Sequence, residues 1–123
     1  MKDETVTLTL PAKAQYMTLA RLAAAAMAGQ AGFNVEQIED VKSAVAEACL
    51  MLLPAAGERG AITLELWEDA GLRARISAPG HISLEHLSDE QEFGRFLLQA
   101  LLDQAELVQT QEHSEYLLYR ALD

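Results

Sequence analysis

The sequence contains only one cysteine, Cys49, and few basic residues. Of its 123 residues, 9 are Lys or Arg and 19 are Asp or Glu, so the formal net charge is −10. A single cysteine excludes an internal disulfide and a cysteine metal cluster, and Cys49 fits a small core residue. The shortage of basic side chains argues against direct binding to nucleic acid or anionic lipid, since both need basic patches. The charge permits a protein partner with a basic surface.

Long apolar runs are also missing. No segment approaches the ~20 apolar residues that a membrane span needs, and Arg21 interrupts the alanine-rich segment 19–29. The first ten residues have no long apolar stretch before a cleavage site, so we expect no secretory signal and a cytoplasmic location. Half of the residues are hydrophobic, which fits one globular domain, residues 1–123, with one core.

Capping patterns predict where two helices begin. Asn34 is followed by Gln37, and Ser88 by Gln91, each three residues on, as in a capping box. Pro54 is expected to end the first of these helices. A further helix should follow the strand that Pro11 ends. The three expected helices cover residues 13–28, 34–53 and 88–104.

Apolar periodicity predicts the buried face of each helix. The expected stripe of the first helix is Tyr16, Leu19, Ala23, Ala26 and Met27. The expected stripe of the second is Ile38, Val41, Val45, Ala48, Cys49 and Leu52. The expected stripe of the third is Phe93, Phe96, Leu97, Ala100 and Leu101.

Alternating apolar residues predict the strands. They occur near residues 5–10, in a hairpin at 62–66 and 72–76, and in two final segments, 106–110 and 115–121. Together with the helices, this order predicts an α+β fold, a two-layer sandwich with one mainly antiparallel sheet and helices on one face. Trp67 alternates away from the apolar side of its strand, which predicts a place on the open face or at an interface.

Three segments carry a resemblance to a known family. They are LPAKAQYMTLARL, GFNVEQIEDVKSAVAEAC and FGRFLLQALLDQAEL, at residues 10–22, 32–49 and 93–107. They resemble the bacterial anti-sigma-factor serine kinases of the GHKL superfamily. The resemblance implies the Bergerat (histidine-kinase-like ATPase) fold, with three helices on one face of a mixed, mainly antiparallel sheet.

The family's first nucleotide motif places a carboxylate and, four residues later, an asparagine on one helix face. The carboxylate acts as the general base and the asparagine ligates magnesium. Glu47 matches the base position, whereas Met51 occupies the asparagine position. A thioether is a poor ligand for Mg²⁺, which prefers oxygen. Without a metal site, Glu47 also fits an ordinary solvated carboxylate.

The family's other two motifs read adenine and phosphate. An aspartate two residues before a glycine accepts a hydrogen bond from adenine, and here Ala78 precedes Gly80. A glycine pair lets backbone amides approach phosphate, and here Glu92 replaces the first glycine while Gly94 is kept. Gly80 and Gly94 also fit turn and close-packing positions.

The three substitutions predict a pocket that no longer binds ATP, with Met51 and its leucine neighbours as core. The resemblance then implies a non-catalytic regulator that binds a sigma factor or an anti-sigma antagonist in a partner-switching circuit. One alternative is an active serine/threonine protein kinase that uses ATP and magnesium. A second is a structural dimerisation domain. The sequence leaves open whether the chain is an enzyme and which protein it binds.

Cofactors and oligomeric state follow from the same interpretation. We expect no cofactor, unless the kinase alternative holds. His81, Glu85 and His86 do not have the spacing of a metal site. Family members form homodimers, so we expect a homodimer with the first strand or first helix in its interface.

Overall fold

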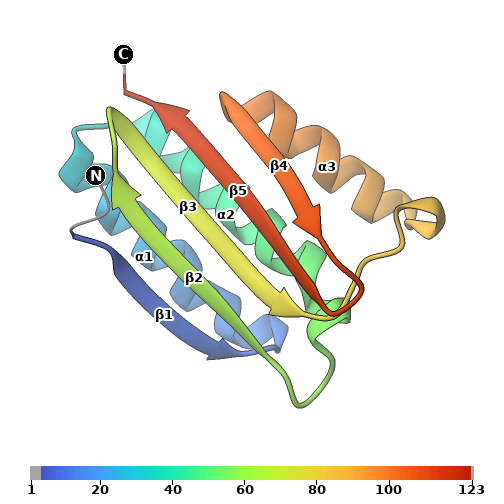
Figure 1. Ribbon diagram of the computed structural model, residues 1–123. Helices are drawn as coiled ribbons and strands as arrows, with labels where there is room; N and C mark the ends of the chain where they lie inside the picture. The colour runs from blue at the N-terminus through green and yellow to red at the C-terminus, as the bar shows by residue number, and fades with distance from the viewer. Residues whose placement is uncertain (1–3, 123) are drawn as a thin grey trace.

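A computed structural model describes residues 4–122 as one antiparallel sheet covered on one face by helices (Figure 1). The strands are β1 (Val6–Pro11), β2 (Ala61–Glu68), β3 (Gly71–Pro79), β4 (Gln104–Gln109) and β5 (His113–Ala121). The helices are α1 (Met17–Ala31), α2 (Val35–Ala56) and α3 (Asp89–Leu101), with 3₁₀ turns at Ala14–Tyr16 and Leu84–His86. The expected two-layer α+β sandwich is confirmed.

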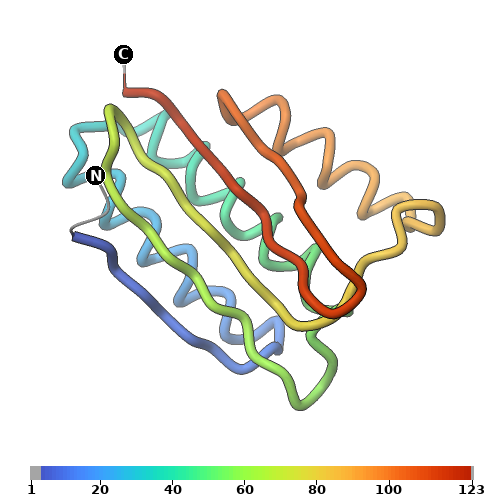
Figure 2. The backbone as a smooth tube through the Cα atoms, viewed as in Figure 1, coloured from blue at the N-terminus to red at the C-terminus, as the bar shows by residue number. Residues whose placement is uncertain are grey.

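The sheet has the strand order β1-β2-β3-β5-β4, and every neighbouring pair is antiparallel. Figure 2 shows β1 and β4 at opposite edges, with α3 beside β4. Between residues 4 and 122, no helix has the length and apolar character needed to cross a membrane.

Both predicted capping boxes are present. Asn34 Oδ1 accepts a hydrogen bond from Gln37 N at 2.8 Å, and Gln37 Oε1 accepts one from Asn34 N at 2.9 Å. Ser88 and Gln91 make the same reciprocal pair at the start of α3. These bonds satisfy backbone amides that the first turn of a helix leaves without partners.

The predicted end of α2 at Pro54 is wrong, because the helix continues to Ala56 with Pro54 inside it. Proline lacks the N–H that would bond to the carbonyl of Leu50. Leu50 is 43% exposed, so the break in the bonding pattern lies on the solvent side of the helix. Gly57 N still donates to Leu53 O at 3.2 Å, which completes the last turn.

The predicted buried stripe of α1 is largely wrong. The helix buries Met17, Ala20, Ala24, Met27 and Ala28. Leu19 is 48% exposed and Ala26 also faces solvent. Almost every position of this segment is apolar, so the sequence does not define one face. Small alanines let α1 approach its neighbours closely, and the larger leucines are left outside.

The predicted stripe and end of α3 are also wrong. Phe93 and Phe96 are 60% and 65% exposed, whereas Gly94 and Leu98 are buried. The helix ends at Leu101, and β4 begins at Gln104. Gly94 explains why the buried face of α3 differs from the predicted one. A residue without a side chain allows the closest approach to α2, so Gly94 faces α2 and the two phenylalanines face solvent.

Trp67 lies on the face of the sheet opposite the helices, but it is only 8% exposed. It is paired across the strands with Arg73, which is paired in turn with Tyr119. The Arg73 guanidinium lies 4.2 Å from the centre of the Tyr119 ring. This row of large side chains leaves Trp67 little surface for a partner.

Candidate functional site

The site that the family resemblance implies lies where the second half of α2 meets the start of α3. Glu47 and Met51 stand one turn apart on α2. A Cβ atom built on Gly94 of α3 would lie 2.5 Å from Glu47 Oε2 and 3.7 Å from Met51 Sδ. The backbone of α3 therefore packs directly against both side chains, and the structure brings Glu47, Met51 and Gly94 together.

Met51 and Ala78 belong to the hydrophobic core. Each is only 2% exposed. Leu52 is fully buried beside Met51, but Leu50 is 43% exposed, so the end of α2 is not buried on every side. A thioether and a methyl group thus occupy the two positions for which the family resemblance implies a metal ligand and an adenine acceptor.

A hollow remains beside Met51. It has a volume of about 460 Å³ and is lined by Glu47, Leu50, Met51, Ser88, Glu90 and Gln91. Two of these residues carry carboxylates and none is basic. The wall therefore offers no cation for a phosphate group, and its carboxylates repel one.

The start of α3 is acidic and already capped. Asp89, Glu90 and Glu92 all lie in its first turn. Negative side chains at this end interact favourably with the helix dipole, which would otherwise attract an external anion. Glu92 is exposed, and Ser88 Oγ accepts a hydrogen bond from Gln91 N at 3.1 Å. The start of α3 is thus capped and compensated by its own residues.

The two glycines of the family motifs have packing reasons of their own. Gly80 has a φ of 92°, and a Cβ atom on it would lie 2.1 Å from the carbonyl oxygen of Ala55 at the end of α2. Gly80 N donates to Glu112 O at 2.8 Å, which fixes the turn after β3. A Cβ atom on Gly94 would meet the end of the Glu47 side chain rather than backbone. Gly80 therefore requires glycine even in the absence of nucleotide, whereas Gly94 allows close packing of α3 on α2.

Ser114, which no sequence motif indicated, lies at the same end of the sheet. It is fully buried, is paired across the strands with Ala78, and lies 2.8 Å from Gly80 O and 2.9 Å from Gln109 Oε1. The Gln109 side chain in turn bonds to both backbone groups of Ile82, at 3.0 and 2.9 Å. The sequence signal for a buried Ser114 was its spacing in β5. It lies two and four residues before the apolar Tyr116 and Leu118, which places all three on the core side of the strand.

The remaining candidate groups do not form a reactive centre. Burial raises the pKa of the Cys49 thiol to about 12, so it stays protonated and is a poor nucleophile. His81 Nδ1 lies 3.2 Å from Thr110 O, and Glu85 and His86 lie in the exposed 3₁₀ turn. Within residues 4–122, no three His, Cys, Asp or Glu side chains gather as a metal site.

Comparison with known proteins places this geometry in context. The model of the histidine kinase-like ATPase domain family matches residues 10–116. The serine-protein kinase RsbW of Listeria monocytogenes serovar 1/2a is 41% identical over 96 residues, covering 74% of this chain and 60% of the relative. The serine-protein kinase RsbW of Bacillus cereus (strain AH187) is 31% identical over 126 residues, covering 85% of this chain and 78% of the relative.

A solved structure has the same fold. The crystal structure of the RsbU and RsbW domains of Rv1364c from Mycobacterium tuberculosis matches 96% of this chain with a TM-score of 0.75. Sequence identity is 16%, and the match covers 32% of that chain. The alignment with the Listeria relatives spans about 60% of their length.

Proposed function

The chain belongs to the histidine kinase-like ATPase domain family, among the anti-sigma-factor serine kinases, and we propose that it is a non-catalytic member that acts by binding a protein. Its partner is a sigma factor or an anti-sigma antagonist in a partner-switching circuit.

One observation carries the proposal: the residues at the nucleotide site do not provide what ATP and magnesium need. Met51 is buried and has no oxygen for Mg²⁺. Ala78 has no acceptor for the adenine amino group. The first turn of α3 carries three carboxylates where a triphosphate would approach. Each change removes a different requirement, so no single compensating contact restores binding.

An active serine kinase is the second candidate, and two observations favour it. Glu47 keeps the position of the general base, and a hollow of about 460 Å³ adjoins it. In a kinase, this carboxylate would take the proton from the substrate hydroxyl. That role also requires a bound metal and phosphate, for which the surrounding side chains are poorly suited.

Calorimetry with ATP and magnesium separates the two candidates. We expect no binding heat at millimolar ATP with magnesium. The matched control is Glu47→Gln, which removes the carboxylate charge with little change of shape. Saturable micromolar binding to the parent that Glu47→Gln alters would contradict the non-catalytic proposal and support the kinase.

The proposed partner surface is basic, since the chain carries a net charge of −10. Electrostatic attraction between exposed charges is screened by salt. Affinity for a sigma factor or antagonist should therefore fall as ionic strength rises, which titrations at low and high salt measure. A strongly acidic partner bound with salt-independent affinity would contradict this part of the proposal.

We also propose a homodimer built on β1 and α1. β1 is an edge strand, and Leu19 and Leu22 on α1 are 48% and 58% exposed. Free strand edges and exposed leucines both favour association. Light scattering should give a dimer that Leu22→Glu weakens and Val35→Glu, at an exposed apolar site on α2, leaves intact. A monomer at high concentration would contradict the dimer and with it the dimerisation-domain alternative.

A further inference from the structure

β4 leaves part of its backbone available for a new strand. Thr110 N donates to His113 O at 2.8 Å, so these residues form a hydrogen-bonded pair of the β4–β5 ladder. Such pairs recur at every second residue of an antiparallel ladder. Glu106 and Val108 therefore bond to β5, whereas the N–H and C=O of Leu107 point away from the sheet. In the described part of the chain, no residue hydrogen-bonds to these two groups of Leu107.

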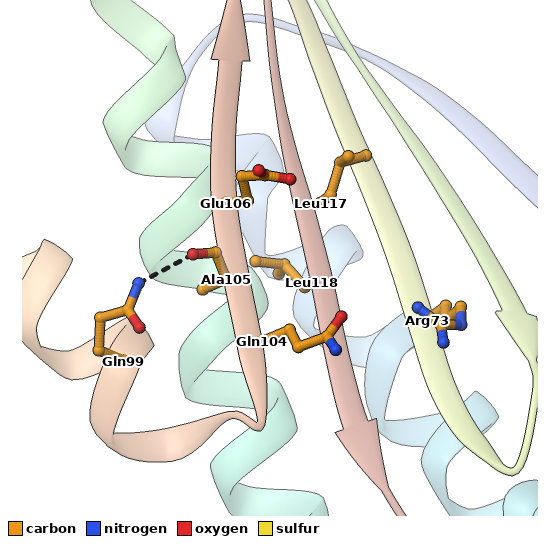
Figure 3. Close-up of a pocket in the computed structure, with 7 residues that line it drawn as sticks. All are labelled: Arg73, Gln99, Gln104, Ala105, Glu106, Leu117 and Leu118. Carbon is orange, nitrogen blue, oxygen red and sulfur yellow. Dashed lines mark hydrogen bonds between the residues drawn. The ribbon is translucent and has the colours of Figure 1, made fainter.

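This free edge is short and closed at both ends. At one end, Gln99 Nε2 of α3 donates to Ala105 O at 2.8 Å, as Figure 3 shows. At the other, the Gln109 side chain holds the backbone of Ile82. Between them only Leu107 turns its N–H and C=O outward, so an added strand can form two backbone hydrogen bonds at this edge.

A hollow adjoins this edge on the helix side. It has a volume of about 280 Å³ and is lined by Arg95, Phe96, Gln99, Ala105, Leu107 and Tyr116. Phe96 is 65% exposed and stacks on Phe93 with 6.3 Å between ring centres. Apolar side chains of an added strand would cover these rings, which the fold itself leaves in water.

The other face of this edge carries one exposed carboxylate. Glu106 is exposed on the face of the sheet opposite the helices, next to the second hollow of Figure 3, of about 480 Å³. Residues directly opposite on neighbouring strands interact, and opposite charges there are favourable. A lysine or arginine facing Glu106 would gain such a pair.

We propose that β4 is a docking edge for an extended, basic segment of a protein partner. The segment adds a strand beside Leu107, places an apolar side chain against Phe96 and sets a basic side chain opposite Glu106. The unpaired backbone donor and acceptor select a polypeptide rather than a small molecule. The inference rests on protein binding as the proposed function and is independent of whether ATP binds.

A second copy of this chain is a poorer occupant of the same edge. Pairing two antiparallel β4 strands would place both exposed Glu106 side chains on the same face of the joined sheet. Like charges oppose such an interface. The edge therefore suits a basic partner better than itself.

A designed peptide tests the proposal on the full chain. The peptide is a capped sequence of about eight residues that alternates lysine with valine, a typical strand length, labelled for fluorescence anisotropy. Its matched controls carry N-methyl groups on the valines or on the lysines, so charge and composition are equal. In an antiparallel docked strand the residue opposite Leu107 shares its face and bonds to it, so the valine N–H groups face β4. We expect saturable binding that valine methylation weakens at least tenfold and lysine methylation largely preserves.

Variants of the chain locate the binding site. Leu107→Pro removes the outward N–H without removing a bond to β5, so we expect at least a tenfold loss of affinity. Leu107→Ala, which keeps the N–H, should lose less, and Phe96→Ala should lose several-fold with the fold intact. Val35→Ala, at an exposed site at the start of α2, should bind like the parent.

Three outcomes would overturn the inference. They are equal binding of both methylated peptides, equal binding by Leu107→Pro and the parent, or concentration-dependent self-association that Leu107→Pro abolishes. None of these outcomes depends on whether ATP binds in the calorimetric experiment. Failure of the docking proposal is therefore distinguishable from failure of the non-catalytic proposal.

Discussion

The two halves of α2 treat polar side chains in opposite ways. In the first half, Asp40 pairs with Arg120 of β5 at 3.0 Å, and Arg120 also donates to Leu101 O at 2.6 Å. In the second half, Glu47 lies against the backbone of α3 and Met51 is buried. On this helix, a polar side chain forms an ion pair where the sheet provides an oppositely charged partner.

The neighbours of the two halves differ as well. The first half begins at a capping box and is joined to the sheet through side chains. In the second half, the backbone of other segments packs directly against the helix. Gly80 lies against Ala55, and Gly94 of α3 lies against Glu47. Close backbone packing leaves little room for substitution, so the second half should be the more sensitive to mutation.

Met51 should give the largest effect. Met51→Ala removes most of a buried side chain and should lower the free energy of unfolding by about 2–5 kcal/mol. Met51→Asn should also destabilise, because it buries an amide without partners. Urea unfolding measures both, with Met51→Leu as a control of similar volume. If both variants unfold at the urea midpoint of the parent, Met51 is not part of the core.

Gly80→Ala should come next, at about 2–3 kcal/mol, since it combines a left-handed φ with overlap of the Ala55 carbonyl. Gly57→Ala is a matched control, because Gly57 has a φ of 76° but no atom within 4 Å of its Cβ position. The difference between the thermal unfolding midpoints of the two variants measures the effect of overlap with the Ala55 carbonyl, apart from the strain of a positive φ. Equal midpoints would show that backbone strain alone explains the glycine.

In the first half, Asn34→Ala should cost about 1 kcal/mol, the usual value for loss of a helix cap. It removes the acceptor for Gln37 N. Asn34→Ser keeps an acceptor and should stay close to the parent in chemical denaturation. A serine variant as unstable as the alanine variant would contradict the capping explanation.

Asp40→Ala should have the smallest effect, about 0.5 kcal/mol, because the ion pair with Arg120 is partly exposed and screened by water. Arg120 keeps its bond to Leu101 O. The cost should shrink further at high salt, whereas the effect of Met51→Ala should not. If Asp40→Ala lowered the free energy of unfolding more than Met51→Ala does, the first half of α2 would be the more sensitive to mutation.

The candidate site was partly readable from the sequence. The spacing of Glu47 and Met51 predicted a shared helix face, and the structure places both against α3. The hollow beside them and the buried Ser114 were not predicted. Both depend on how closely separate elements approach each other, and no local pattern contains that distance.

The sequence by itself determined the order of elements, the start of α2 and α3, and the core face of the central hairpin. These follow from side chains within a few residues of each other, as in the Asn34–Gln37 and Ser88–Gln91 pairs. Only the tertiary structure decided the faces of α1 and α3. The alanine-rich α1 has no distinct polar face, and Gly94 turned the phenylalanines of α3 outward. Packing against α2 selects those faces, since the closest contact is made by the smallest residues.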